Sequence, residues 1–129
     1  MSYRLLQGAE DDIDLILLKG ADDWGLDASV RYNRLMLAVF TALGASPGLR
    51  GSKAVPGVDG VRAYHLRLGR HWVEAGNRVG QPRHLVVYRI GGDGMVEVIG
   101  LAHDRMMLTG AALRMQRLEA GDLRKEPRQ

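Results

Sequence analysis

Residues 79–104 read VGQPRHLVVYRIGGDGMVEVIGLAHD, and residues 60–72, shortly before them, read GVRAYHLRLGRHW. Three runs in these two stretches have the alternating apolar pattern or the β-branched content of strands, over residues 61–68, 83–90 and 95–102. The GGDG tetrapeptide between the last two runs favours a tight turn with positive φ. The three runs therefore predict an antiparallel meander.

The predicted sheet is basic, whereas the start of the chain is acidic. Residues 31–105 contain eleven arginine and lysine residues against five acidic ones, and residues 1–30 contain seven acidic residues against two basic ones. This asymmetry indicates a polyanion or an acidic protein as the partner, rather than a small apolar substrate. The alternative interpretation is that the charges only solvate exposed faces of helices and strands.

Two helices precede the sheet. After a short strand over residues 3–6, apolar residues recur at helical spacing over residues 9–24. Gly25 interrupts the pattern, and a second helix begins at Leu26 or Asp27 and ends at Gly44. We expect the two helices to form an antiparallel hairpin that Trp24 anchors.

The segment between the hairpin and the sheet, GASPGLRGSKAVPGVDG at residues 44–60, is rich in glycine and proline. It predicts a long surface connection with neither helix nor strand. A last helix follows the sheet from His103 onward. We place the domain at residues 1–113 and a polar tail at residues 114–129, which comprises the end of that helix and then disorder.

A length of 129 residues corresponds to one domain, and the order of predicted elements is that of an α+β protein. The chain contains no cysteine, which excludes disulfides, thiolate metal sites and a cysteine nucleophile. Its apolar runs are too short to span a bilayer. We expect a cytoplasmic protein without membrane association, cofactor or metal.

Five phrases of the sequence carry a family resemblance: DDIDLI, DDWGLDASVRYNRL, GVRAYHLR, PRHLVVYRI and DGMVEVIGLAHDRM. Together they resemble the RelE/ParE superfamily of toxins from type II toxin-antitoxin (plasmid stabilisation) systems, and specifically its ParE-like branch. The resemblance covers residues 3 to about 108. It implies a RelE/ParE-like α+β fold with an N-terminal strand, an α-helical hairpin, a three-stranded antiparallel meander and a C-terminal helix.

The ParE-like branch implies a toxin that is not an enzyme. Such toxins inhibit DNA gyrase by protein binding and stall it on cleaved DNA, and a small ParD-like antitoxin neutralises them in a toxin-antitoxin hetero-oligomer. We expect a disordered, acidic and amphipathic antitoxin segment to fold on the basic surface of this chain.

The RelE-like branch implies an alternative, a ribosome-dependent mRNA endoribonuclease. Cleavage at a ribose 2′-hydroxyl needs a general base, a general acid and fixed positive charge. If the chain is a ribonuclease, the catalytic candidates are His65, Arg67, Arg83 and His103, with His84 beside them. No tyrosine follows Tyr88, so the last helix lacks the tyrosine that RelE itself uses. A third alternative is a non-toxic member kept as an antitoxin-binding module.

For a binding protein, the candidate partner-binding residues are Arg67, Arg70, Trp72, Arg83 and His84. The predicted hairpin at residues 69–81 is longer than the usual turn of this family, and its Trp72 either anchors a protein partner or packs back on the core. Structural interpretations also exist for the histidines. His65 and His84 can face each other across neighbouring strands, and residues 102–104 can cap the last helix.

Overall fold

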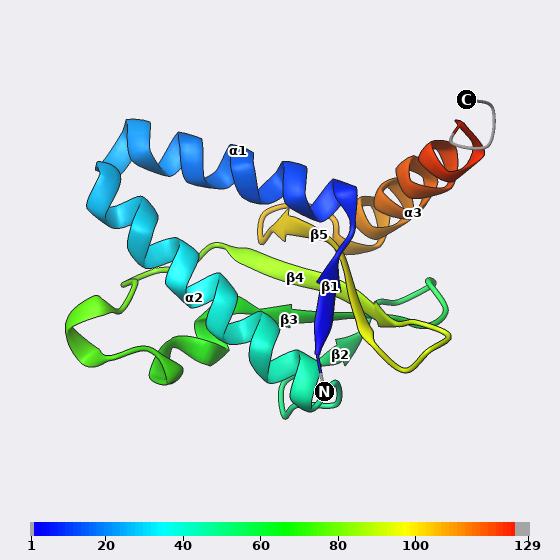
Figure 1. Ribbon diagram of the computed structural model, residues 1–129, viewed down its shortest axis with the longest axis horizontal. Coiled ribbons are helices and arrows are strands. Elements are labelled where there is room, and N and C mark those ends of the chain that lie inside the picture. Colours follow the sequence, from blue (N-terminus) through cyan, green and yellow to red (C-terminus); the bar gives the residue numbers. More distant parts are fainter. Residues whose placement is uncertain (1, 126–129) are drawn as a thin grey trace.

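The computed structural model describes the backbone of residues 2–125 and the side chains of residues 2–120. Figure 1 shows its elements in chain order: β1 (Tyr3–Leu5), α1 (Gln7–Trp24), α2 (Leu26–Ala45), β2 (Lys53–Ala54), β3 (Val61–His65), the 3-10 helices η1 (Leu66–Trp72) and η2 (Ala75–Asn77), β4 (His84–Ile90), β5 (Val96–His103) and α3 (Leu108–Lys125). The α+β class and the helical hairpin are confirmed.

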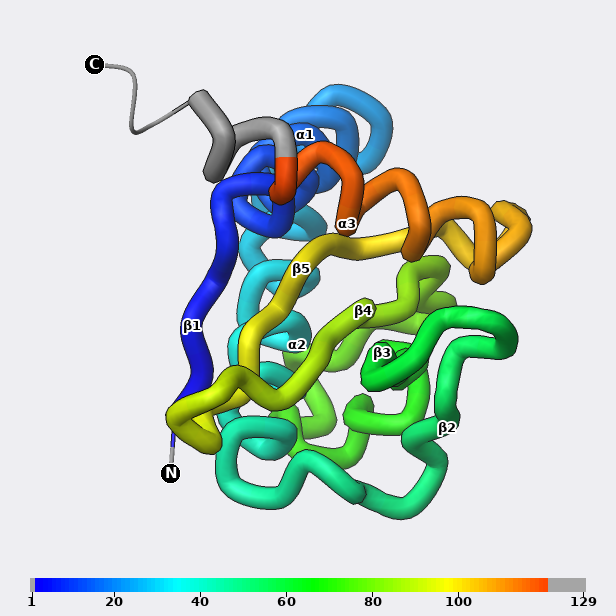
Figure 2. The backbone as a smooth tube through the Cα atoms, turned by 90° about the vertical axis from the view of Figure 1, so that its right-hand side faces the viewer, coloured from blue at the N-terminus to red at the C-terminus, as the bar shows by residue number. Residues whose placement is uncertain are grey.

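The strands form one sheet in the order β1-β5-β4-β3-β2, which Figure 2 shows side by side. β3, β4 and β5 make the predicted antiparallel meander. β1 adds to it in parallel with β5, and Arg4 lies opposite Glu97. Gly94 adopts a φ of 84° in the turn between β4 and β5, as the GGDG tetrapeptide predicts.

Two local predictions about the sheet were wrong. The connection after α2 contains the short strand β2, in which Lys53 pairs with Ala63. A strand of two residues is too short to show a periodic pattern, so the pairing of β2 depends on the neighbouring strand β3. β3 ends at His65 instead of residue 68, because the His65 side chain accepts a hydrogen bond from the backbone N–H of Arg67 and the chain turns into η1.

Helices cover both faces of the sheet. The α1–α2 hairpin packs on one face, where α2 residues such as Met36 and Phe40 meet Tyr88 in the larger core. α3 packs on the other face, where Ala112 contributes to a second core around Val87. Figure 2 shows α2 behind the sheet and α3 in front of it. Each large apolar side chain buried in this way stabilises the fold by roughly 1.5–3 kcal/mol.

α3 extends beyond the domain boundary that we drew at residue 113. Within the expected tail, Met115 packs against the second core and Glu119 forms an ion pair with Arg89 of β4 at 2.5 Å. The helix continues to Lys125. The expected disorder at residues 126–129 lies outside the described residues.

Within residues 2–125, none of the helices combines the length and the apolar composition that crossing a bilayer requires.

Candidate functional site

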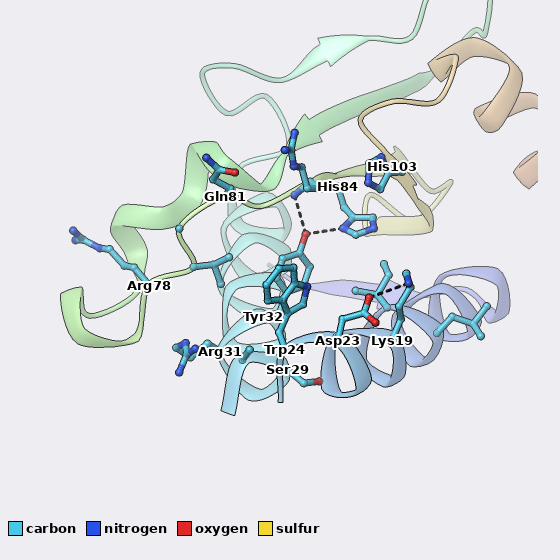
Figure 3. Close-up of a pocket in the computed structure, with 17 residues that line it drawn as sticks. Lys19, Asp23, Trp24, Ser29, Arg31, Tyr32, Arg78, Gln81, His84 and His103 are labelled. Carbon is cyan, nitrogen blue, oxygen red and sulfur yellow. Dashed lines mark hydrogen bonds and ion pairs between the residues drawn. The ribbon is translucent and has the colours of Figure 1, made fainter. Parts of the chain in front are cut away.

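A cavity of about 850 Å³ lies where the α1–α2 corner faces the segment that leads into β4. Apolar side chains of α1, among them Leu15, Ile16 and Trp24, line one side of it. Tyr32 of α2 and two histidines, His84 and His103, line the other side (Figure 3). A concave apolar site with a few convergent polar groups is typical of binding sites.

Tyr32 and His84 form the central contact of this cavity. The backbone N–H of Arg83 donates to the Tyr32 hydroxyl at 3.1 Å, and the hydroxyl lies 2.6 Å from Nδ1 of His84. In the His84 tautomer that carries its proton on Nε2, the hydroxyl donates its own hydrogen to Nδ1. Burial, with the neighbouring His103, lowers the pKa of His84 to about 4, so the ring is neutral at neutral pH.

His84 and His103 lie opposite each other on β4 and β5. Their rings meet edge to face with centroids 5.3 Å apart. Nδ1 of His103 accepts a hydrogen bond from the backbone N–H of Arg105 at 3.1 Å, so a neutral His103 also carries its proton on Nε2. Among the described residues, neither Nε2 atom has a hydrogen-bond partner, and in these tautomers both are donors at the cavity wall.

His65, by contrast, is buried at the end of β3 and lies opposite Leu85, so our expectation that it faces His84 was wrong. Its Nδ1 accepts from Arg67, and its Nε2 lies 3.2 Å from a carboxylate oxygen of Asp104. Burial lowers the pKa of His65, although the hydrogen bond to Asp104 opposes the shift. Both ring nitrogens are therefore occupied within the protein.

The proposed cap of the last helix was also wrong. α3 begins at Leu108, four residues after Asp104, and Asp104 is instead bonded to His65. Ala102 and His103 belong to β5, which ends one residue later than we expected, at His103.

The predicted partner-binding residues divide into two places. Arg83 and His84 line the cavity. Arg67, Arg70 and Trp72 lie on η1, outside the cavity lining. Trp72 stacks on Tyr64 with ring centroids 6.2 Å apart and is 39% exposed, so it packs back on the core.

Two cavity residues were missed. Trp24 was expected to anchor the hairpin, but its side chain is 79% exposed at the cavity. The helical period could not show this, because Trp24 is the last residue of α1 and its direction depends on the turn at Gly25. Tyr32 was not among the predicted site residues. A buried tyrosine usually needs a hydrogen-bond partner for its hydroxyl, and this requirement is the feature by which the sequence could have indicated a polar contact at Tyr32.

The rim of the cavity is basic. Its charged lining residues are Lys19, Arg31, Arg78, Arg83 and Asp23, and the carboxylate of Asp23 pairs with Lys19 at 2.9 Å. Figure 3 shows Arg31 and Arg78 extending away from the aromatic residues at one side. An apolar wall with unpaired arginines at its rim suits an acidic segment with an apolar anchor. Among the described residues, no group of three or more acidic or histidine side chains is placed to hold a metal ion.

Neither the known protein-family models nor the curated proteins contain a match to this chain.

Proposed function

We propose that the chain is a ParE-like toxin of a type II toxin-antitoxin system, which inhibits DNA gyrase by binding and is neutralised by a ParD-like antitoxin in a hetero-oligomer. The observation that carries the proposal is the 850 Å³ cavity, because it joins an apolar wall to positively charged side chains at its opening. The order of strand, helical hairpin, antiparallel meander and helix agrees with the fold that the sequence resemblance implies. The resemblance alone supplies gyrase as the target.

The histidine geometry favours binding over hydrolysis. Efficient proton transfer needs a group with a pKa near the working pH. His84 has a pKa of about 4 and remains neutral, and both nitrogens of buried His65 are already hydrogen-bonded. Arg67 does not line the cavity. Of the four catalytic candidates, only Arg83 and His103 remain at the cavity.

The test is inhibition of gyrase supercoiling by the purified protein, with accumulation of cleaved DNA as the second readout. If the cavity is the contact, Trp24→Ala should raise the inhibitory concentration about 30-fold, since a buried aromatic anchor contributes about 2 kcal/mol. Leu113→Ala, which removes an exposed apolar side chain of α3, is the matched control and should change nothing. Full gyrase activity at saturating toxin would contradict the proposal.

The antitoxin provides a separate test. An acidic, amphipathic antitoxin segment should bind the toxin and restore gyrase activity, and Arg83→Ala should weaken this binding. A toxin that binds no such segment would refute this part of the proposal. A chain that binds the segment but leaves gyrase active would instead be the non-toxic antitoxin-binding module.

One observation favours the ribonuclease as a second candidate. In the tautomers protonated on Nε2, His84 and His103 present two donors beside the positive charge of Arg83. Cleavage of a phosphodiester requires such donors and cations to stabilise the charge that develops on the phosphate. On translating ribosomes, His103→Gln should then lower mRNA cleavage by about 10²-fold or more, whereas a binding contact would weaken only in small steps. Arg117→Ala on α3 serves as the control. Intact mRNA with the unmodified protein would exclude this candidate.

A further inference from the structure

Three basic side chains form a second charged surface outside the cavity. We call Lys53, Arg67 and Arg70 the basic rim. All three are exposed, and none of them lines the cavity. Within the described part of the chain, none is within ion-pair distance of a carboxylate. Their charges are therefore available to a partner.

The 3-10 geometry of η1 places Arg67 and Arg70 on one face. Side chains three residues apart eclipse each other in a 3-10 helix, and a rise of about 2 Å per residue separates them by about 6 Å. Leu66 and Gly69, which are also three residues apart, are both buried. The two arginines consequently project from an exposed face of a helix whose other side packs on the protein.

Strand pairing brings Lys53 toward the same place. Lys53 of β2 lies opposite Ala63, and Ala63 shares a face of β3 with His65. Arg67 lies next to His65, because its backbone N–H donates to the imidazole. The pKa of His65, which burial lowers most, is lowered further by the positive charges of both Arg67 and Lys53. Lys53 and Arg67 therefore lie near His65 at the end of β3, and Arg70 follows Arg67 on the same face of η1.

The aromatic residue beside the basic rim is already engaged. One side of the Trp72 indole stacks on Tyr64, and the ring centroids of His71 and Trp72 are 4.9 Å apart. Proteins that bind single-stranded nucleic acid present aromatic faces on which the bases stack. The Trp72 indole, 39% exposed, offers at most one face, and the basic rim itself consists of cations alone, which suits a paired duplex that presents its phosphates outward.

We propose that the basic rim binds the phosphate backbone of duplex DNA without reading its sequence. This contact is separate from the gyrase contact and does not depend on it. The isolated protein should bind weakly, in the range of about 10⁻⁴ to 10⁻⁶ M that is typical of non-specific binding. On a complex of gyrase and DNA, the same contact would become intramolecular and therefore stronger.

The test is fluorescence anisotropy of a labelled, mixed-sequence DNA duplex, titrated with the full chain at several salt concentrations and without gyrase. Three phosphate contacts predict that log K falls against log salt with a slope of about −2.7. The double variant Arg67→Ala and Arg70→Ala should reduce the slope to about −0.9. The matched lysine double variant keeps both charges and should retain most of the slope.

Arg117→Ala removes an exposed positive charge on α3, controls for the general loss of charge, and should lower the slope less than the double alanine variant. An unchanged slope in the rim double variant would overturn the proposal, and so would tighter binding to single-stranded RNA or to polyglutamate than to the duplex. Because gyrase is absent, a failure here leaves gyrase inhibition unaffected, and the cavity variant Trp24→Ala should bind the duplex normally.

Discussion

The Tyr32 hydroxyl and Nδ1 of His84 lie 2.6 Å apart, although the two residues are 52 positions apart in the chain. This hydrogen bond connects α2 to the first residue of β4. It also satisfies the backbone N–H of Arg83, which donates to the same hydroxyl. One phenol therefore connects the entry into β4, the His84 ring and one wall of the cavity.

Tyr32→Phe removes this hydroxyl and leaves two polar groups without their partner. We expect the free energy of unfolding to fall by about 0.5–1.5 kcal/mol, the usual net contribution of a hydrogen bond. Urea denaturation measures the change. Tyr3→Phe is the matched control, because the Tyr3 ring packs on Phe40 and its hydroxyl makes no hydrogen bond within the described structure. Equal stability of Tyr32→Phe and the unmodified protein would contradict the prediction.

The neutral state of His84 makes stability depend on pH. Its pKa is about 4 in the folded protein and about 6.5 when unperturbed. Between these values the unfolded chain binds a proton that the folded chain does not, so this stabilisation is complete above pH 6.5 and declines as the pH falls toward 4. The loss should reach up to about 3 kcal/mol. The lowered pKa of His65 adds a loss of the same sign.

Unfolding by urea at pH 7 and at pH 4.5 measures this dependence. His84→Gln keeps an acceptor for Tyr32 but does not titrate, so its loss on acidification should be smaller. His71→Gln removes an exposed histidine of η1 and should lose as much stability as the unmodified protein. An NMR titration midpoint of His84 above pH 6 would refute the assignment.

Arg89 holds α3 against the sheet. Its guanidinium binds Glu97 of β5 at 2.8 Å and both carboxylate oxygens of Glu119 on α3, at 2.8 and 2.5 Å. Arg89→Lys keeps the charge but cannot bind both oxygens of Glu119 in the same way. We therefore expect the free energy of unfolding to fall by about 1–2 kcal/mol and the α3 amides to exchange hydrogen faster. Lys19→Ala, which breaks an exposed ion pair on α1, should leave the urea midpoint of unfolding unchanged. Unaltered exchange in Arg89→Lys would show that α3 is held by its apolar face alone.

Gly69 allows η1 to lie close to α2. A Cβ at this position would be 2.6 Å from a methyl of Val39 and 2.7 Å from the Trp72 ring. Gly69→Ala should therefore lower the free energy of unfolding by about 1–3 kcal/mol. Gly76→Ala in η2 is the control, because nothing lies within 4 Å of its added Cβ. Thermal melting of both variants tests the pair, and similar midpoints would contradict this packing.

Local patterns predicted the regular elements well. The helical period of α1 and α2, the break at Gly25 and the strands β4 and β5 were recognised to within about two residues, because each is long enough to carry its own signal. β2, the end of β3 and the length of α3 were not predicted. β2 and the end of α3 depend on distant partners, Ala63 for Lys53 and Arg89 for Glu119, and the end of β3 depends on the side-chain contact of His65 with the Arg67 N–H, which periodicity does not show.

The candidate site shows the same division. By itself, the sequence determined the α+β class, the basic character of the region from β3 to β5 and the presence of its histidines and arginines, since these follow from composition and short-range period. Only the tertiary structure decided which of them meet. Tyr32 joins His84, His103 faces His84, and His65 is withdrawn into a pair with Asp104. Hydrogen bonds and burial act through space, so contacts between residues distant in the chain exist only once helix and sheet have packed together.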